Sequence, residues 1–178
     1  MEIANAGQAI KPENGRFTYE GSAMSLDMLV MMLEMETVSI LDNQIASRLE
    51  EIDRRNKRVE KVNRGMAFAK QARTDVKNKD GDNPKTNNSK WNDFVADLRE
   101  DPELRGLAND LKTGNLSEAD WEANVTHLEN YISGQNNISQ QDMLKLQTLM
   151  TNRGHAFNLA TNTLSKVSET KRNILSKF

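Results

Sequence analysis

The sequence is short of several residue types that would open particular kinds of chemistry. Among its 178 residues there is no cysteine, there are three prolines and nine glycines, and aromatic residues make up only 5%. Without cysteine the chain has no disulfide, no thiolate metal site and no cysteine nucleophile. The scarcity of proline and glycine, together with 28% charged residues, is typical of a helical protein rich in coiled coil.

Long apolar runs and a dominant charge of one sign are also missing. The longest apolar run covers residues 28–33, far short of the ~20 residues that span a bilayer. The N-terminus lacks the basic start and apolar core of a cleaved secretory signal. The formal net charge is −2, so no global basic field attracts nucleic acid or anionic lipid. We expect a soluble chain without a direct membrane span.

No motif in the sequence indicates catalysis or a cofactor. It lacks a phosphate-binding glycine loop, G-x-S-x-G and H-E-x-x-H. The two histidines do not form a site: His127 lies two positions from Glu129, so the two side chains do not face each other on a helix, and His155 is expected at an interface or in solvent. We therefore expect neither an enzyme nor a cofactor.

A basic cluster at residues 54–58 is the one candidate for nucleic-acid binding. Acidic residues lie within a turn of it and no aromatic side chain is interleaved. These features favour a solvated helix face. A nucleic-acid-associated coiled coil that uses residues 54–64 stays open as a minor alternative, and we expect no nucleic-acid partner.

Residues 24–77 predict one long helix of a coiled coil. Ser25 is a plausible N-cap, Asp27 lies in the first turn, and Gly65 is the only glycine after the cap. Apolar residues recur every seven positions, with a weaker second column that contains Arg48 and Arg55. The candidate interface residues of this helix are Val38, Leu41, Ile45, Ile52, Val59, Val62 and Met66.

The segments that flank this helix lack a long repeat. We expect residues 1–23 to be a flexible arm and residues 78–137 to be a loop followed by short helices. Trp91 and Trp121 are expected in a small satellite core. Ser117 with Asp120 resembles a capping box, and Gly134 followed by residues 135–138 predicts a helix end and a hinge.

Residues 138–178 carry the strongest pattern, the 3-4 spacing of a coiled-coil seam. Its candidate interface residues are Met143, Leu146, Met150, Phe157, Leu164, Val167 and Ile174. Residues 24–46 carry acids and no base, whereas this last segment is mainly basic, which favours antiparallel pairing of the two helices. The expected fold is therefore all-α: a long antiparallel coiled-coil hairpin with a small helical insert.

The last helix, from Gln140 through Leu149 and on to Ile174, resembles the C-terminal coiled coil of type III secretion needle-tip filament proteins. These are the EspA/SseB-like hydrophilic translocators, with LcrV- and IpaD-type tip proteins more distant in role. Residues 25–69 resemble the long N-terminal helix of this family, and the insert shows no similarity. The likeness covers residues 24–77 and 138–178, and the order of arm, long helix, insert and last helix is shared.

This resemblance implies a protein exported without cleavage, whose N-terminal arm is the secretion signal. A cytosolic chaperone would hold it before export. At the cell surface it would assemble with itself on the needle subunit and support insertion of translocator pore proteins into a host membrane. The alternative from another class is a cytosolic helical chaperone or adaptor that binds a partner helix.

Overall fold

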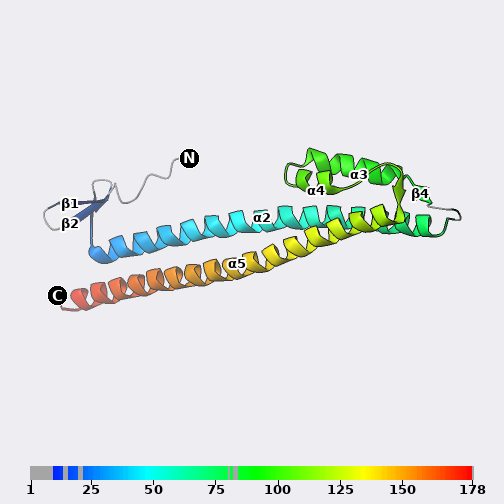
Figure 1. Ribbon diagram of the computed structural model, residues 1–178. Coiled ribbons are helices and arrows are strands. Elements are labelled where there is room, and N and C mark those ends of the chain that lie inside the picture. The colour runs from blue at the N-terminus through cyan, green and yellow to red at the C-terminus, as the bar shows by residue number, and fades with distance from the viewer. Residues whose placement is uncertain (1–9, 14–15, 20–21, 80, 82–83, 178) are drawn as a thin grey trace. The chain divides into compact units, whose positions relative to one another are not determined.

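The computed structural model describes residues 10–13, 16–19, 22–79, 81 and 84–177. The elements run in the order β1 (Ile10–Glu13), β2 (Arg16–Tyr19), β3 (Ser22–Met24), α2 (Leu26–Lys77), β4 (Lys85–Thr86), α3 (Ser89–Glu100), α4 (Arg105–Asp110), β5 (Leu116–Ser117) and α5 (Glu118–Leu175) (Figure 1). The two long helices, α2 and α5, pack together as an antiparallel hairpin with a small insert. This arrangement confirms the predicted all-α fold class.

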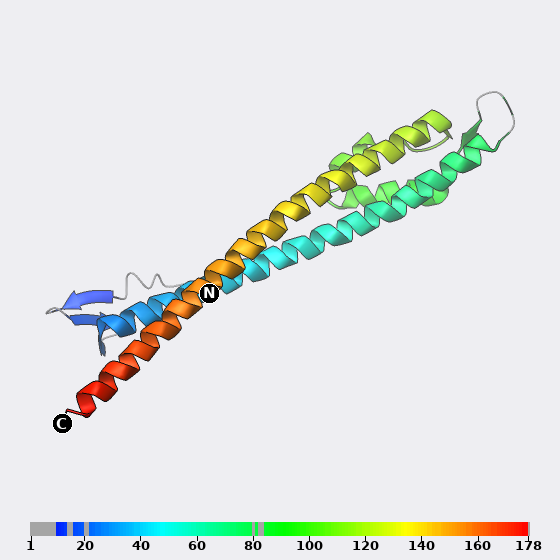
Figure 2. The same cartoon turned by 90° about the horizontal axis from the view of Figure 1, so that it is seen from below.

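The chain divides into two compact units, and both contain part of α2 and part of α5. The first unit comprises Met1–Arg48 and Leu144–Phe178, and the second comprises Leu49–Met143. Within each unit the α2 and α5 stretches run in opposite directions (Figures 1 and 2).

The helix α2 of the first unit begins where its sequence predicts. The Ser25 side-chain oxygen accepts a hydrogen bond of 3.3 Å from the backbone N–H of Met28. This bond satisfies one of the backbone donors that the first turn of a helix leaves without a partner. Asp27 lies in that first turn, where its negative charge meets the positive end of the helix dipole. The predicted N-cap is therefore confirmed.

The expected flexible arm at residues 1–23 is corrected for the residues that the structure describes. Strands β1, β2 and β3 form an antiparallel sheet in that order. Glu13 pairs with Arg16 and Tyr19 pairs with Ser22, so each connection is two residues long. The sequence between the first two strands is Asn-Gly, a dipeptide typical of two-residue hairpins. This dipeptide is the local signal of a hairpin in a segment that has few apolar residues.

The core of the second unit gathers side chains from α2, the insert and the start of α5. Trp91 and Trp121 are both fully buried and lie 5.4 Å apart between ring centroids, in an edge-to-face arrangement. The predicted tryptophan core is thus confirmed, and it also takes in a face of α2. The core residues are Val62, Ala69, Ala72, Val76, Trp91, Phe94, Val95, Leu98, Leu104, Leu107, Ala108, Leu111, Leu116, Trp121, Val125 and Leu128.

The insert is fastened to α5 by a buried amide. Asn124 is fully buried, and its side chain bonds both backbone groups of Lys112: its oxygen accepts from the N–H at 2.9 Å and its nitrogen donates to the carbonyl at 3.0 Å. The same carbonyl accepts a bond of 2.9 Å from the indole nitrogen of Trp91. These three bonds join α3, α5 and the segment that follows α4 at one point. A short β4–β5 pairing, Lys85 with Ser117 and Thr86 with Leu116, closes the base of the insert.

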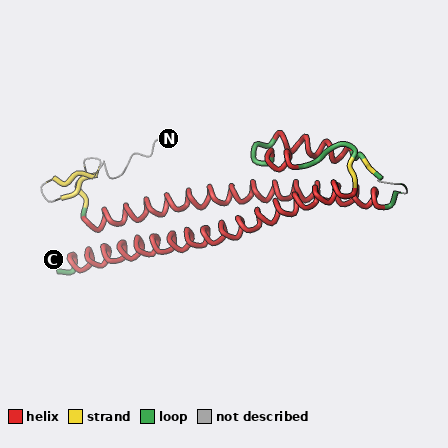
Figure 3. Tube along the Cα trace, in the orientation of Figure 1, coloured by secondary structure: helices red, strands yellow, loops and turns green. Residues whose placement is uncertain are grey.

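The predicted helix end at Gly134, the hinge at residues 135–138 and the new helix at 138 are wrong. Helix α5 starts at Glu118 and continues without interruption to Leu175 (Figure 3), so the insert covers residues 78–117 instead of 78–137. An internal glycine costs a helix about 1 kcal/mol, which packing of the flanking turns offsets. The 3-4 spacing continues through this region on one face of α5. Its partly or fully buried positions are 128, 132, 135, 139, 142 and 146.

Candidate functional site

The buried side of α2 contains the interface residues that its sequence predicts. Val38 and Val62 are buried, at 6% and 0% exposure, and the other candidates Leu41, Ile45, Ile52, Val59 and Met66 are half-buried. The polar members of the second column belong to the seam as well, because Arg48 is half-buried and Arg55 is only 8% exposed. The α2 candidates therefore lie inside the hairpin.

The seam of α5 differs from the predicted one at five of the seven candidate residues. One predicted column is retained, with Leu146 buried and Val167 half-buried. The other buried column contains Asp142, Leu149, Ala156 and Thr163. The larger side chains one position further on face solvent instead, and Ile174 near the end of the helix does too. The exposed fractions of Met143, Met150, Phe157, Leu164 and Ile174 are 48%, 58%, 49%, 54% and 53%.

In the second unit a buried ion pair determines which face of α5 turns toward α2. The sequence alone did not reveal this pair. Arg55 of α2 and Asp142 of α5 form a salt bridge, and their side chains are only 10% and 3% exposed. The second arm of the Arg55 guanidinium donates to Glu51 at 3.2 Å. A buried charge without a partner is strongly unfavourable, so Asp142 turns toward α2 and its larger neighbour Met143 turns to solvent.

In the first unit a second pair joins the same two helices. Arg153 of α5 binds Asp42 of α2 through two contacts, of which the bond from the guanidinium terminus is 3.3 Å long. Both side chains are nearly half exposed, and the carboxylate raises the pKa of Arg153 above its ordinary value. Such an exposed pair contributes little to stability, but it orients α5 against α2.

The start of α5 is capped as predicted. The Ser117 hydroxyl accepts from the backbone N–H of Asp120 at 3.3 Å, and the Asp120 carboxylate accepts from the backbone N–H and hydroxyl of Ser117 at 3.1 and 2.7 Å. Lys112 also donates to this carboxylate at 2.6 Å. Hydrogen bonds from Lys112 first, and then from Ser117, hold the pKa of Asp120 well below its ordinary value. The reciprocal bonds are those of a capping box.

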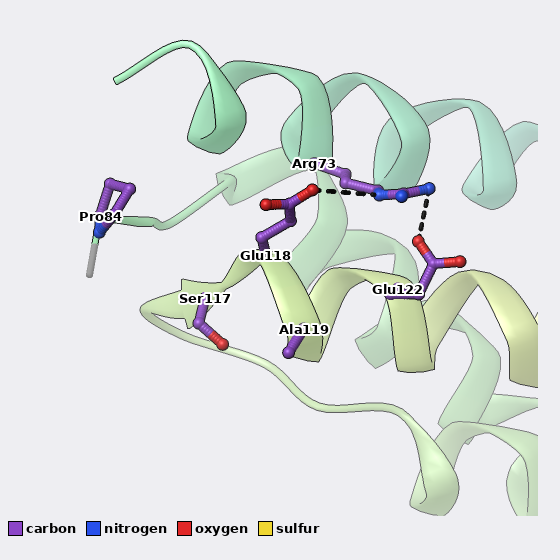
Figure 4. A pocket seen from close by; sticks show the side chains of 6 residues that line it. All are labelled: Arg73, Pro84, Ser117, Glu118, Ala119 and Glu122. Atoms are coloured by element: carbon purple, nitrogen blue, oxygen red, sulfur yellow. Dashed lines mark ion pairs between the residues drawn. The ribbon is translucent and has the colours of Figure 1, made fainter. Parts of the chain in front are cut away.

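The pockets of the second unit offer no evident chemistry. The pocket at the start of α5 is lined by Arg73, Pro84, Ser117, Glu118, Ala119 and Glu122. In it the guanidinium of Arg73 lies between two carboxylates, 3.9 Å from Glu118 and paired with Glu122 (Figure 4). Both signs of charge are therefore already engaged. Among the residues that the structure describes, no cluster of His, Cys, Asp or Glu has the arrangement of a metal site.

The basic cluster at residues 54–58 is neutralised locally. Its cations pair along the helix and with the insert: Arg54 with Glu50, Lys57 with Asp53, Arg58 with Asp101 and Arg55 with Asp142. A phosphate backbone would have to displace these carboxylates. The charges of this region thus favour an internally paired helix face over a nucleic-acid interface.

The remaining candidate is the exposed apolar column of α5. Met150, Phe157 and Leu164 lie in the first unit, and Met143 continues the column in the second. A helix whose apolar stripe is wider than one seam is typical of packing against more than one neighbour. Within the described part of the chain, no helix has the length and apolarity that a membrane crossing requires.

Comparisons with known proteins give no further assignment. No protein family, no curated protein and no solved structure matches the chain.

Proposed function

We propose that the protein is a structural, self-assembling component of a type III secretion needle tip or of its filamentous extension. In this role copies of the chain assemble on the needle subunit and scaffold the insertion of translocator pore proteins into a host membrane. Before export a cytosolic secretion chaperone keeps it soluble, and residues 1–23 contain the export signal. The resemblance of residues 24–77 and 138–178 to needle-tip filament proteins supports the choice of this system.

The observation that carries self-assembly is the exposed column on α5. Met150, Phe157 and Leu164 recur every seven residues and are about half exposed. Apolar side chains in a regular column along a helix form a surface that is stabilised by contact with another helix. The order of the elements, a long helix, an insert and a second long helix, also agrees with the family.

The alternative function, a cytosolic chaperone or adaptor, uses the same column for a different partner. A groove beside an apolar helix face can accept an amphipathic helix of another protein. Export separates the two functions. We expect the protein in the culture supernatant of a strain with an active type III apparatus, and we expect deletion of residues 1–20 to retain it in the cells. Retention of the intact chain would favour the adaptor.

Self-assembly is tested on the purified protein. A charge placed on the column by Phe157→Asp or Leu164→Asp would have to be buried without a partner on association. We therefore expect both variants to remain monomeric in sedimentation velocity at concentrations where the parent chain forms larger species. Asn162→Asp, which adds the same charge on an exposed position of α5 away from the column, is the matched control. Oligomers of equal size in all four proteins would refute this role of the column.

A further inference from the structure

The first unit exposes apolar side chains on both of its long helices. On α2, Met28 and Met35 are 48% and 49% exposed. On α5, Met150, Phe157 and Leu164 are 58%, 49% and 54% exposed. The three α5 residues were predicted to lie in a seam, whereas neither methionine was among the predicted interface residues.

The two sets of residues lie on the same side of the hairpin. On α2, Met35 and Asp42 each follow a half-buried position, Glu34 and Leu41, by one residue, and Met28 lies seven residues before Met35 in the same column. The three α5 residues likewise each follow one of the seam positions 149, 156 and 163. When two helices pack antiparallel, the equivalent flanking columns of the two helices lie on the same side of the seam. The column of Met28 and Met35 and the column of Met150, Phe157 and Leu164 are equivalent in this sense.

The ion pair of the first unit agrees with this placement. Asp42 belongs to the same seven-residue column as Met28 and Met35, and it reaches across the seam to Arg153. On α5, Arg153 is one turn from both Met150 and Phe157. The ion pair therefore lies within this side, which we call the methionine face: Met28, Met35, Asp42, Met150, Arg153, Phe157 and Leu164.

Charge distinguishes the two helices that carry the methionine face. In the first unit α2 carries Asp27, Glu34, Glu36 and Asp42 and no base before Arg48. On this side of the hairpin α5 carries Arg153 and Lys171 and no acid, whereas Lys145 and Lys166 belong to the column of Leu159 on the opposite side of the seam. A partner for this face needs a basic helix opposite α2 and an acidic helix opposite α5, both flanking apolar residues. A second copy of the first unit supplies both.

We propose that the methionine face docks on the same face of a second copy, about a two-fold axis that runs along the helices. This inference rests on the self-assembly proposed above and adds its geometry. The axis places α2 of each copy against α5 of the other at the same level, so acidic stretches meet basic ones and methionines meet Phe157 and Leu164. Interfaces of this kind are self-complementary, and methionine adapts its shape to the contact.

The absence of native cysteine allows a direct test by disulfide crosslinking. Met35→Cys and Phe157→Cys are made in two proteins of different mass, which are mixed and oxidised. A disulfide forms only where the Cα atoms approach within about 7 Å. We expect the mixed disulfide about tenfold faster than either homodisulfide, because docking raises the effective concentration of the two thiols. Met28→Cys with Leu164→Cys provides a second pair if either variant fails to fold.

The control pair is Thr37→Cys with Leu159→Cys, two exposed positions that flank the seam on the opposite side. Equal crosslinking of the control and test pairs would overturn the proposal, as would predominance of the Phe157→Cys homodisulfide, which indicates contact between two α5 helices. Both results leave self-assembly intact. A parent chain that sediments as a monomer at every concentration, with no crosslink in any pair, overturns both this inference and the proposed self-assembly.

Discussion

Replacing Gly65 with alanine is expected to destabilise the protein, although helix propensity alone predicts the opposite. Gly65 lies inside α2, where alanine is favoured over glycine by about 1 kcal/mol. A Cβ atom at this position would lie 2.0 Å from Cζ and 2.2 Å from Cε1 of Phe94. The ring of Phe94 from α3 therefore packs directly on the backbone of α2.

The size of the effect depends on whether that ring can move. Phe94 is 7% exposed, and its centroid lies 5.4 Å from that of Trp91, so core side chains confine it. Forcing extra volume into a packed core costs typically 1–3 kcal/mol. Once the propensity gain of about 1 kcal/mol is subtracted, Gly65→Ala should destabilise the second unit by up to about 2 kcal/mol. That corresponds to a fall in Tm of about 4–8 °C for a chain of this size.

Two glycines of α5 provide matched controls for the same substitution. A Cβ at Gly134, in the second unit, or at Gly154, in the first, meets nothing within 4 Å, so alanine there should stabilise its own unit by about 0.5–1 kcal/mol. Circular dichroism follows the first unit and therefore the change at Gly154. Urea denaturation followed by tryptophan fluorescence reports on the second unit, since both tryptophans belong to its core. A Phe94→Leu background should reduce the penalty at Gly65. If Gly65→Ala stabilised the protein as much as Gly134→Ala, the proposed contact with the Phe94 ring would be refuted.

Three further predictions concern polar groups of the second unit. Asp142→Leu should destabilise it by about 3–5 kcal/mol in urea denaturation, because Arg55 is left buried without its main partner, and the double change with Arg55→Leu should recover most of the loss. Asn124→Ala should cost about 1–3 kcal/mol by the same assay, because it leaves the backbone N–H of Lys112 without its acceptor; an unchanged stability would contradict this. The lowered pKa of Asp120 means that its ionised form stabilises the fold above its ordinary pKa near 3.8. This contribution should diminish as the pH falls below about 4, and a denaturation series from pH 7 to 3 should show a shallower loss for Asp120→Asn.

The long-range plan of the fold could be predicted from the sequence because it depends on repetition. Seven-residue columns over residues 24–77 and over the last forty residues are sustained enough to identify two helices, and their opposite charge makes them antiparallel neighbours. The caps at Ser25 and Ser117 could also be predicted, since each depends on the side chain of one residue and a backbone group three positions away.

The continuity of α5 could not be predicted in the same way. Between Ile132 and Leu146 its buried face consists of Gln135, Ser139 and Asp142, so a pattern built on apolar residues stops there. Gly134 and the polar residues after it then resemble a helix end. What maintains the helix is a tertiary contact, because Asp142 is buried against Arg55 from a segment far away in the chain. Local helix propensity is a weak guide wherever a tertiary contact of this kind determines the secondary structure.

The exposed column of α5 exists because the hairpin buries the column of residues one position earlier in the sequence. Judged by hydrophobicity, Met143, Met150, Phe157 and Leu164 belong inside, and the alternative column that contains Asp142 and Ala156 does not. The hairpin buries the smaller residues: Ala156 and Ala160 are 6% and 4% exposed, and small side chains let two helices approach closely. A second helix packed against Met150, Phe157 and Leu164 would bury these larger side chains. The self-assembly proposed above predicts such a contact, and the crosslinking experiment tests it.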